Sequence, residues 1–215
     1  MSAPPEWLTR VAPALEARPP DWFAEFVPPP DPARRSAVLM AFTDGDHGRE
    51  VILTERAATL RSHASQVSFP GGHLDPGDLH PTAAAIREAE EEVGLHPDSV
   101  EIVAELPALY MHPTQNAVTP VLAWWARPHP IGVVDVAEVA RVVRTDVDHL
   151  LDPANRFSVR FGSYRGPAFD VDGLFVWGFT ASLLDHVFDL AGLTRRWDGD
   201  VERPLPEHLL AAYRP

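Results

Sequence analysis

Apolar and polar positions follow two different periods along the chain, and each period predicts a different kind of element. Short apolar runs at 37–42 and 51–54 flank a polar, glycine-containing stretch at 44–48, which is typical of a β-hairpin. Further runs predict strands at 100–111, 118–125, 139–144 and 157–161, with a turn near 170–173. Apolar residues at helical spacing predict a helix over 177–190.

The most distinct helical segment is 82–93, which consists of strong helix formers and ends at Gly94, a residue suited to a helix C-cap. Strands interleaved with two main helices predict a layered α/β or α+β domain. The proline-rich stretch 19–32 cannot be one regular element, because each proline removes a backbone donor and restricts the residue before it. We expect it to form an arm laid over a single domain.

Composition narrows the classes of function. The chain has no cysteine, so any metal site must use oxygen or imidazole ligands, and carboxylates favour hard cations. A net charge of −13 argues against binding to long nucleic acid, which needs clustered basic residues. No apolar run approaches the roughly 20 residues of a membrane-spanning helix, and the N-terminus lacks the order of a secretory signal. We therefore expect a cytoplasmic protein with no membrane or nucleic-acid partner.

Three glutamates gather on one face of the predicted helix. At about 100° per residue, Glu88, Glu91 and Glu92 fall within one arc, opposite a face of small and apolar residues. A solvated surface is the ordinary interpretation of such a run. However, like charges at i and i+4 destabilise a helix, and the helix dipole disfavours anions in the last turn. A divalent cation would remove both costs, so a metal site is the alternative hypothesis.

The segment before the helix adds a glycine-rich loop, Phe69-Pro70-Gly71-Gly72, followed by Asp75-Pro76-Gly77-Asp78. Together with the helix, this region resembles the Nudix box, Gly-x5-Glu-x7-Arg-Glu-apolar-x-Glu-Glu-x-Gly-apolar. The second half is matched at every fixed position by 87–95. In the first half, Asp78 stands near the first glutamate, and the loop is one residue longer before Arg87. This longer loop and the signature at 53–72 resemble the coenzyme A pyrophosphatase branch, although Ser65 stands where that branch usually has glycine.

The resemblance implies an α/β/α Nudix sandwich with a mixed sheet over 36–195, between an N-terminal arm at 1–35 and a tail at 196–215. It implies metal-dependent hydrolysis of the diphosphate of coenzyme A or its derivatives to 3′,5′-ADP and 4′-phosphopantetheine. In such an enzyme Mg²⁺ or Mn²⁺ would be held by Glu88, Glu91 and Glu92, with the Gly72 carbonyl in support. Arg87 would orient a neighbouring glutamate. Glu138 would add a catalytic or metal-binding carboxylate, with a solvated turn at 135–138 as the alternative.

Substrate binding is expected at Gly71 and Gly72 of the glycine loop and at three residues of the upstream signature, Arg56, Arg61 and His63. The two arginines suit this role because a guanidinium group can bind phosphate with two hydrogen bonds. Two alternatives stay open. One keeps the chemistry and changes the substrate to ADP-ribose, a dinucleotide or a nucleoside triphosphate. The other is a Nudix-fold module that binds a nucleotide without turnover. A homodimer is also open, since the tail near Leu209 and Leu210 could pack on a partner.

Overall fold

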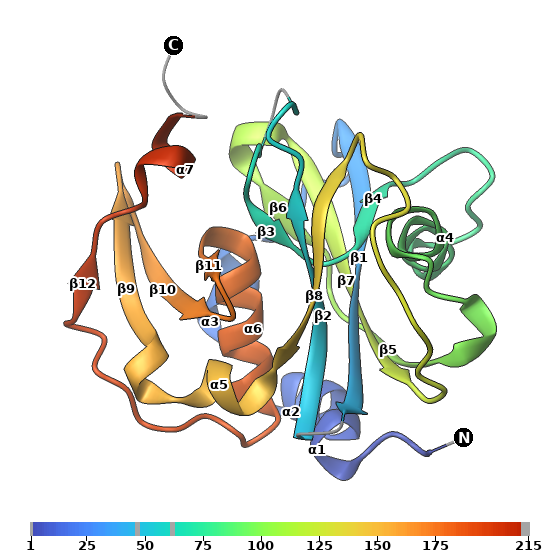
Figure 1. Cartoon of the computed structure of the whole chain (residues 1–215), viewed down its shortest axis with the longest axis horizontal. Helices are drawn as coiled ribbons and strands as arrows, with labels where there is room; N and C mark the ends of the chain where they lie inside the picture. The colour runs from blue at the N-terminus through green and yellow to red at the C-terminus, as the bar shows by residue number, and fades with distance from the viewer. Residues whose placement is uncertain (1, 46–47, 61–62, 212–215) are drawn as a thin grey trace. The chain divides into compact units, whose positions relative to one another are not determined.

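The computed structural model describes residues 2–45, 48–60 and 63–211, and it divides into two compact units. Unit 1 contains Met1–Thr43 and Phe69–Gly132, so it holds the glycine loop and the glutamate helix. Unit 2 contains Asp44–Ser68 and Val133–Pro215. Figure 1 labels the elements of both units.

Unit 1 is built on a mixed sheet. Strand β1 (Arg34–Gly45) runs parallel to β7 (Asn116–Trp125), and β5 (Val100–Glu105) runs antiparallel to β7. Two short strands extend the ladder: β4 (Gly71–His73) pairs with β1, and β6 (Leu109–Met111) pairs with β7, both antiparallel. In β1 and β7 the central residues are buried almost without interruption, as expected for strands covered on both faces.

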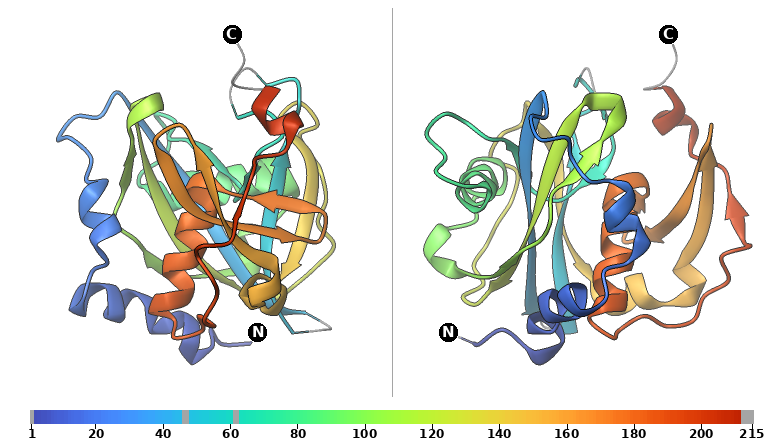
Figure 2. Two further views of the ribbon diagram at one scale, coloured as in Figure 1. Left: turned by 90° about the vertical axis from the view of Figure 1, so that its left-hand side faces the viewer. Right: turned by 180° about the vertical axis from the view of Figure 1, so that it is seen from behind.

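The two faces of this sheet are covered by different helices. Gly72 lies opposite Ala37 in the β1–β4 register, and a side chain at Gly72 would point at Glu88 of helix α4 (Pro81–Val93). Phe42, which alternation places on the opposite face, packs edge-on against Trp7 of α1 (Glu6–Thr9). Figure 2 shows α4 and the N-terminal helices on opposite sides of the strands. Unit 1 therefore has the α/β/α layering that was predicted.

Helix α4 has clear signals at both ends. The His80 side chain accepts the Ala83 amide, Pro81 occupies the first helical position, and Gly94 ends the helix in a left-handed conformation with φ of 73°. Ala85, Ala89 and Val93 are fully buried, which confirms the predicted apolar face.

The N-terminal segment contains helices that the sequence pattern did not predict. These are α1, α2 (Val11–Ala17) and α3 (Asp21–Glu25), and α3 lies between Pro20 and Pro28. The proline-rich stretch is thus not one regular element, but it does hold one short helix. The segment belongs to unit 1 and contacts its strands: the Trp124 indole donates to Ser2, and the Tyr110 amide donates to the Phe26 carbonyl.

Unit 2 has two groups of strands. Strand β2 (Gly48–Arg56) pairs antiparallel with β3 (Val67–Ser68) and with β8 (Val139–Asp146). A second sheet has the order β11 (Leu174–Val176), β10 (Tyr164–Val171), β9 (Arg156–Phe161) and β12 (Glu202–Arg203). The helices of unit 2 are α5 (Val147–Leu151), α6 (Gly178–Leu190) and α7 (Glu207–Ala211). Short 3₁₀ turns in the chain are Pro97–Ser99, His112–Thr114 and Pro153–Asn155.

Two details differ from the sequence expectations. The strand predicted at 100–111 is interrupted between β5 and β6, where Pro107 has no amide hydrogen to donate. The tail near Leu209 is not an exposed apolar surface: Leu209 is only 1% exposed and packs in a cluster with Phe157 and Leu205. Leu209 is therefore not available as an exposed contact for a partner, and the homodimer stays a prediction. In the described part of the chain no helix has the length and apolarity to cross a bilayer.

Candidate active site

The three glutamates of α4 differ strongly in exposure. The Glu91 side chain is 59% exposed and the Glu88 side chain 16%, whereas Glu92 is almost completely buried. Burial of an ionised carboxylate carries a large desolvation cost unless hydrogen bonds or a cation compensate it. Glu92 receives the Gly71 backbone amide at 3.0 Å. The glycine loop is thus held directly against the acidic face of the helix.

Both glycines of the loop are required by close approach. A Cβ at Gly72 would lie 2.5 Å from the Glu88 carboxylate, so this glycine leaves the space that the carboxylate fills. A Cβ at Gly71 would lie 2.3 Å from the Ala37 carbonyl oxygen, and Gly71 has φ of 153°. The Gly-Gly pair is therefore not an ordinary turn. It brings the β4 backbone within contact of the helix and of β1.

Arg87 joins the acidic groups around the helix. Its guanidinium lies 3.0 Å from carboxylate oxygens of Glu88, Glu91 and Asp78, and it donates to the His73 carbonyl. The hydrogen bond to Asp78 is the main cause that raises the pKa of Arg87, and the same bond lowers the pKa of Asp78. Arg87 thus bonds both Glu88 and Glu91 on the acidic side of the helix. No role was predicted for Asp78 from the sequence, although its position close to the first glutamate of the box indicated a functional carboxylate.

The glutamates of α4 supply oxygen ligands of the kind that divalent cations bind. Within 2–45, 48–60 and 63–211 no group of three or more Asp, Glu or His side chains is gathered closely enough to hold a metal ion. The contacts explain this, because Arg87 bonds Glu88 and Glu91 while Glu92 bonds the Gly71 amide. The donor chemistry nevertheless fits: oxygen ligands suit Mg²⁺ and Mn²⁺. Arg87 also faces four carboxylates, of Asp75, Asp78, Glu88 and Glu91, so negative charge is in excess.

In unit 2 two further predicted residues come together. Arg56 ends β2, Glu138 precedes β8, and their charged groups lie 3.9 Å apart. The Ala57 amide donates to the Glu138 carbonyl at 2.8 Å, which fixes the two chain segments beside one another. A register shift between Glu55 and Arg56 marks a bulge, a device that re-aims side chains. The pairing of Arg56 with Glu138, 82 positions apart, could not be read from the local motif.

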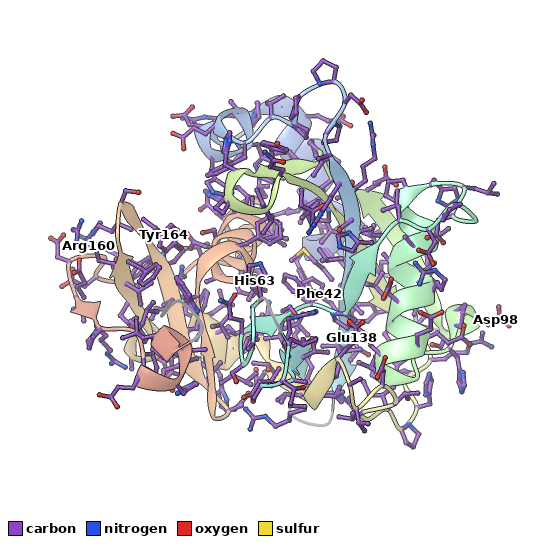
Figure 3. The ribbon with its side chains drawn as sticks, turned by 90° about the horizontal axis from the view of Figure 1, so that it is seen from above. Phe42, His63, Asp98, Glu138, Arg160 and Tyr164 are labelled. Atoms are coloured by element: carbon purple, nitrogen blue, oxygen red, sulfur yellow. The ribbon has the colours of Figure 1, made fainter. Side chains whose placement is uncertain are left out.

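The remaining upstream residues lie in the loop after β2. His63 is exposed, has φ of 56°, and its Nδ1 lies 3.0 Å from the Gln66 side chain (Figure 3). Ser65 also adopts a left-handed conformation, with φ of 58°, and its amide donates to the Arg56 carbonyl. Serine therefore takes the conformation for which glycine is better suited. Arg61 lies outside the described residues.

Comparison with known proteins identifies the family. The model of the NUDIX domain matches residues 33–160. The chain belongs to the Nudix family. This Nudix chain is 36% identical over 140 residues to a protein of Salmonella paratyphi B named "Uncharacterized Nudix hydrolase NudL", covering 62% of the present chain and 71% of that protein. Together with the intact second half of the box, this identifies the chain as a Nudix hydrolase.

Two solved structures align with parts of this chain. A MutT protein from Methanosarcina mazei Go1 has a TM-score of 0.49 and 16% identity, over 75% of this chain and 95% of that one. An Ap4A hydrolase from C. elegans has a TM-score of 0.45 and 20% identity, over 54% of this chain and 83% of that one. At these levels the likeness says nothing about the substrate of the present Nudix hydrolase.

Proposed function

We propose that this Nudix hydrolase cleaves the diphosphate bond of coenzyme A or its derivatives, yielding 3′,5′-ADP and 4′-phosphopantetheine or its acylated form. The observation that carries the chemistry is the contact of the Glu88 and Glu92 carboxylates with the Gly71–Gly72 backbone, beside the Arg87 cluster. The choice of coenzyme A is supported by the signature at 53–72 and by the longer loop before Arg87.

Each residue has a role that follows from its contacts. Glu88, Glu91 and Glu92, with the Gly72 carbonyl, would hold Mg²⁺ or Mn²⁺, which lowers the pKa of a bound water and neutralises charge on the phosphates. Arg87 holds Glu88 and Glu91 in place and ties them to the loop through the His73 carbonyl. Reaction of a diphosphate builds negative charge on the transferring and leaving oxygens, so positioned cations supply most of the catalysis.

Arg56 and Glu138 complete the proposal from unit 2. The Arg56 side chain is 23% exposed, and its contact with Glu138 at 3.9 Å is long for a hydrogen-bonded ion pair, so a phosphate can replace this partner. Release of Glu138 from Arg56 would then leave its carboxylate available as a base or as a metal ligand. Arg61 and His63 remain candidates for phosphate contacts on the evidence of the motif alone.

The test is a substrate panel with a matched pair of variants. Purified protein is incubated with Mg²⁺ or Mn²⁺ and with coenzyme A, ADP-ribose, NADH or a nucleoside triphosphate, and products are separated by chromatography. We expect coenzyme A to be cleaved with the highest kcat/KM and EDTA to abolish turnover. Glu88→Gln should lose activity on the order of 10²-fold or more, the scale of one deleted electrostatic contact.

Glu90→Gln is the control, because Glu90 is an exposed glutamate of the same helix outside the acidic face. It should keep wild-type activity. Equal loss in both variants would show that helix charge in general, and not the assigned face, supports turnover. Binding of these nucleotides without cleavage under every metal condition would instead favour the non-catalytic module.

A further inference from the structure

Unit 2 contains a cavity of about 240 Å³ that has no assigned role. It is defined here as the β3–β11 pocket. Its lining comes from β2, the loop and strand β3, the β10–β11 hairpin and the start of α7, and comprises Glu55, Ser65, Val67, Asp170, Gly173, Leu174, Phe175, Pro206 and His208. Two of its walls, Glu55 and the segment 65–67, belong to the upstream signature. Residues of the signature at 53–72 therefore line part of this pocket.

The walls are fixed by contacts that lie outside the lining. The Arg141 guanidinium lies 3.2 Å from the Glu55 carboxylate and donates to the Gly173 carbonyl at 2.8 Å, so one side chain joins β2 to the hairpin turn. On β3, the Thr180 hydroxyl of α6 donates to the Val67 carbonyl. These bonds hold the pocket open before any ligand arrives, which lowers the entropic cost of binding.

The chemistry of the lining selects against phosphate. Two carboxylates, Glu55 and Asp170, face the pocket, and among the described residues its lining includes one histidine, His208, and no arginine. Arg141 and Arg203 pair with these carboxylates from outside the lining, so the charges are balanced locally. Carboxylate oxygens with remaining lone pairs accept hydrogen bonds from N–H and O–H groups. An uncharged ligand rich in such donors is therefore favoured over an anion.

The other walls are apolar and small. Leu174 and Val67 are buried, and the ring of Phe175 packs against Phe157 with centroids 5.5 Å apart. The volume is below the roughly 300–1,000 Å³ of pockets that enclose a whole ligand. It fits one arm of a larger molecule. A chain with alternating amide groups and short aliphatic pieces satisfies both the carboxylates and the apolar walls.

We propose that the β3–β11 pocket binds the uncharged, amide-bearing arm of the substrate, which for coenzyme A is the pantetheine chain. This inference rests on the proposed function and adds to it the surface that distinguishes coenzyme A from other nucleoside diphosphate derivatives. The position of Glu55 supports the assignment, because this pocket carboxylate is adjacent in sequence to Arg56, the residue proposed to contact phosphate.

The experiment compares two aromatic truncations in the full-length protein. Phe175→Ala removes a pocket wall. Phe161→Ala removes another partly buried ring of the same small sheet, one that packs on Trp177 outside the pocket. We expect Phe175→Ala to lower kcat/KM for coenzyme A by tenfold or more, through KM, while turnover of ADP-ribose changes less than twofold. Phe161→Ala should change neither kcat/KM for coenzyme A nor turnover of ADP-ribose. An equal loss on both substrates in Phe175→Ala would overturn the proposal.

A binding measurement separates this proposal from the proposed function. Free pantetheine, which has no diphosphate, is titrated into wild-type protein, Phe175→Ala and Glu55→Gln, with binding followed by saturation-transfer NMR. Glu55→Gln keeps the shape of the wall and guards against a misfolded Phe175→Ala. We expect pantetheine to bind wild type and to bind both variants more weakly. Binding that is absent from wild type, or unchanged in both variants, would refute the pocket assignment whether or not coenzyme A is cleaved.

Discussion

Alanine substitutions at the two adjacent glycines of the loop should affect different properties: Gly71→Ala should mainly lower stability, and Gly72→Ala should mainly lower activity. A Cβ at Gly71 would lie 2.3 Å from the Ala37 carbonyl oxygen and 2.7 Å from the Val38 Cα, both backbone atoms, at φ of 153°. Strain of about 1–3 kcal/mol from the backbone conformation adds to an overpacking cost of similar size. Gly71→Ala should therefore lower the free energy of unfolding by about 2–6 kcal/mol.

Gly72→Ala meets a different obstacle. Its Cβ would lie 2.5–2.6 Å from the three atoms of the Glu88 carboxylate, which is the end of a flexible side chain. Rotation of Glu88 relieves the clash at a cost of about 0.5–1.5 kcal/mol. The displaced carboxylate would leave Arg87 and the proposed metal position, so activity should fall on the order of 10²-fold while folding changes little.

Urea denaturation followed by tryptophan fluorescence gives the unfolding free energies, and coenzyme A cleavage gives the activities. Gly72→Ala that is fully active, or that is as unstable as Gly71→Ala, would refute the conclusion that Gly72 makes room for a functional carboxylate.

Three further predictions follow from single contacts. Glu92→Gln should lose turnover on the order of 10²-fold. Its thermal midpoint without metal should equal or slightly exceed that of wild type, because the side-chain oxygen of the introduced glutamine still accepts the Gly71 backbone amide while like-charge repulsion falls. Near-normal activity would contradict the role of Glu92. Asp78→Asn should destabilise the protein at pH 7 by on the order of 1–3 kcal/mol. The Arg87 hydrogen bond lowers the pKa of folded Asp78, so its stabilisation is present above the unfolded pKa of about 4 and is lost as pH falls through the folded pKa; a difference between the two proteins that persists at pH 2 would count against this origin. Ser65→Gly should stabilise the protein by up to about 1 kcal/mol in thermal denaturation. The left-handed backbone costs an L-residue about 1–2 kcal/mol, and the greater conformational entropy of glycine in the unfolded chain offsets part of the gain. A lower thermal midpoint would show that the Ser65 side chain itself stabilises the loop.

The sequence predicted those parts of the structure that depend on local signals. Helix α4 could be placed because its formers, its apolar face and Gly94 agree with one another, and the central strands because their apolar runs are long. The N-terminal helices were missed, since prolines at 19–32 dominated the pattern and α3 is only five residues long. Strand β10, with Gly166 and Pro167 in its interior, also lacks the local signals of a strand.

The candidate site shows the same division. Arg87, Glu88, Glu91 and Glu92 could be named because one motif carries all four residues. Contacts between distant segments could not be predicted, because no local pattern encodes them. The bond from Gly71 to Glu92 and the approach of Arg56 to Glu138 became visible only in the folded chain, whereas the place of Asp78 in the box was a local signal for its contact with Arg87. The exposed-tail hypothesis failed for a related reason: Leu209 has its apolar partners on β9 and in Leu205, and local hydrophobicity does not reveal whether such partners exist.

The most direct test of the central claim is the ratio of kcat/KM for coenzyme A to that for ADP-ribose, measured with wild-type protein at saturating Mg²⁺ or Mn²⁺ and with products identified by mass. We predict a ratio well above one, with 3′,5′-ADP and 4′-phosphopantetheine as the products. Rapid cleavage of ADP-ribose with coenzyme A left intact would contradict the assignment of the substrate and leave the glutamate chemistry standing.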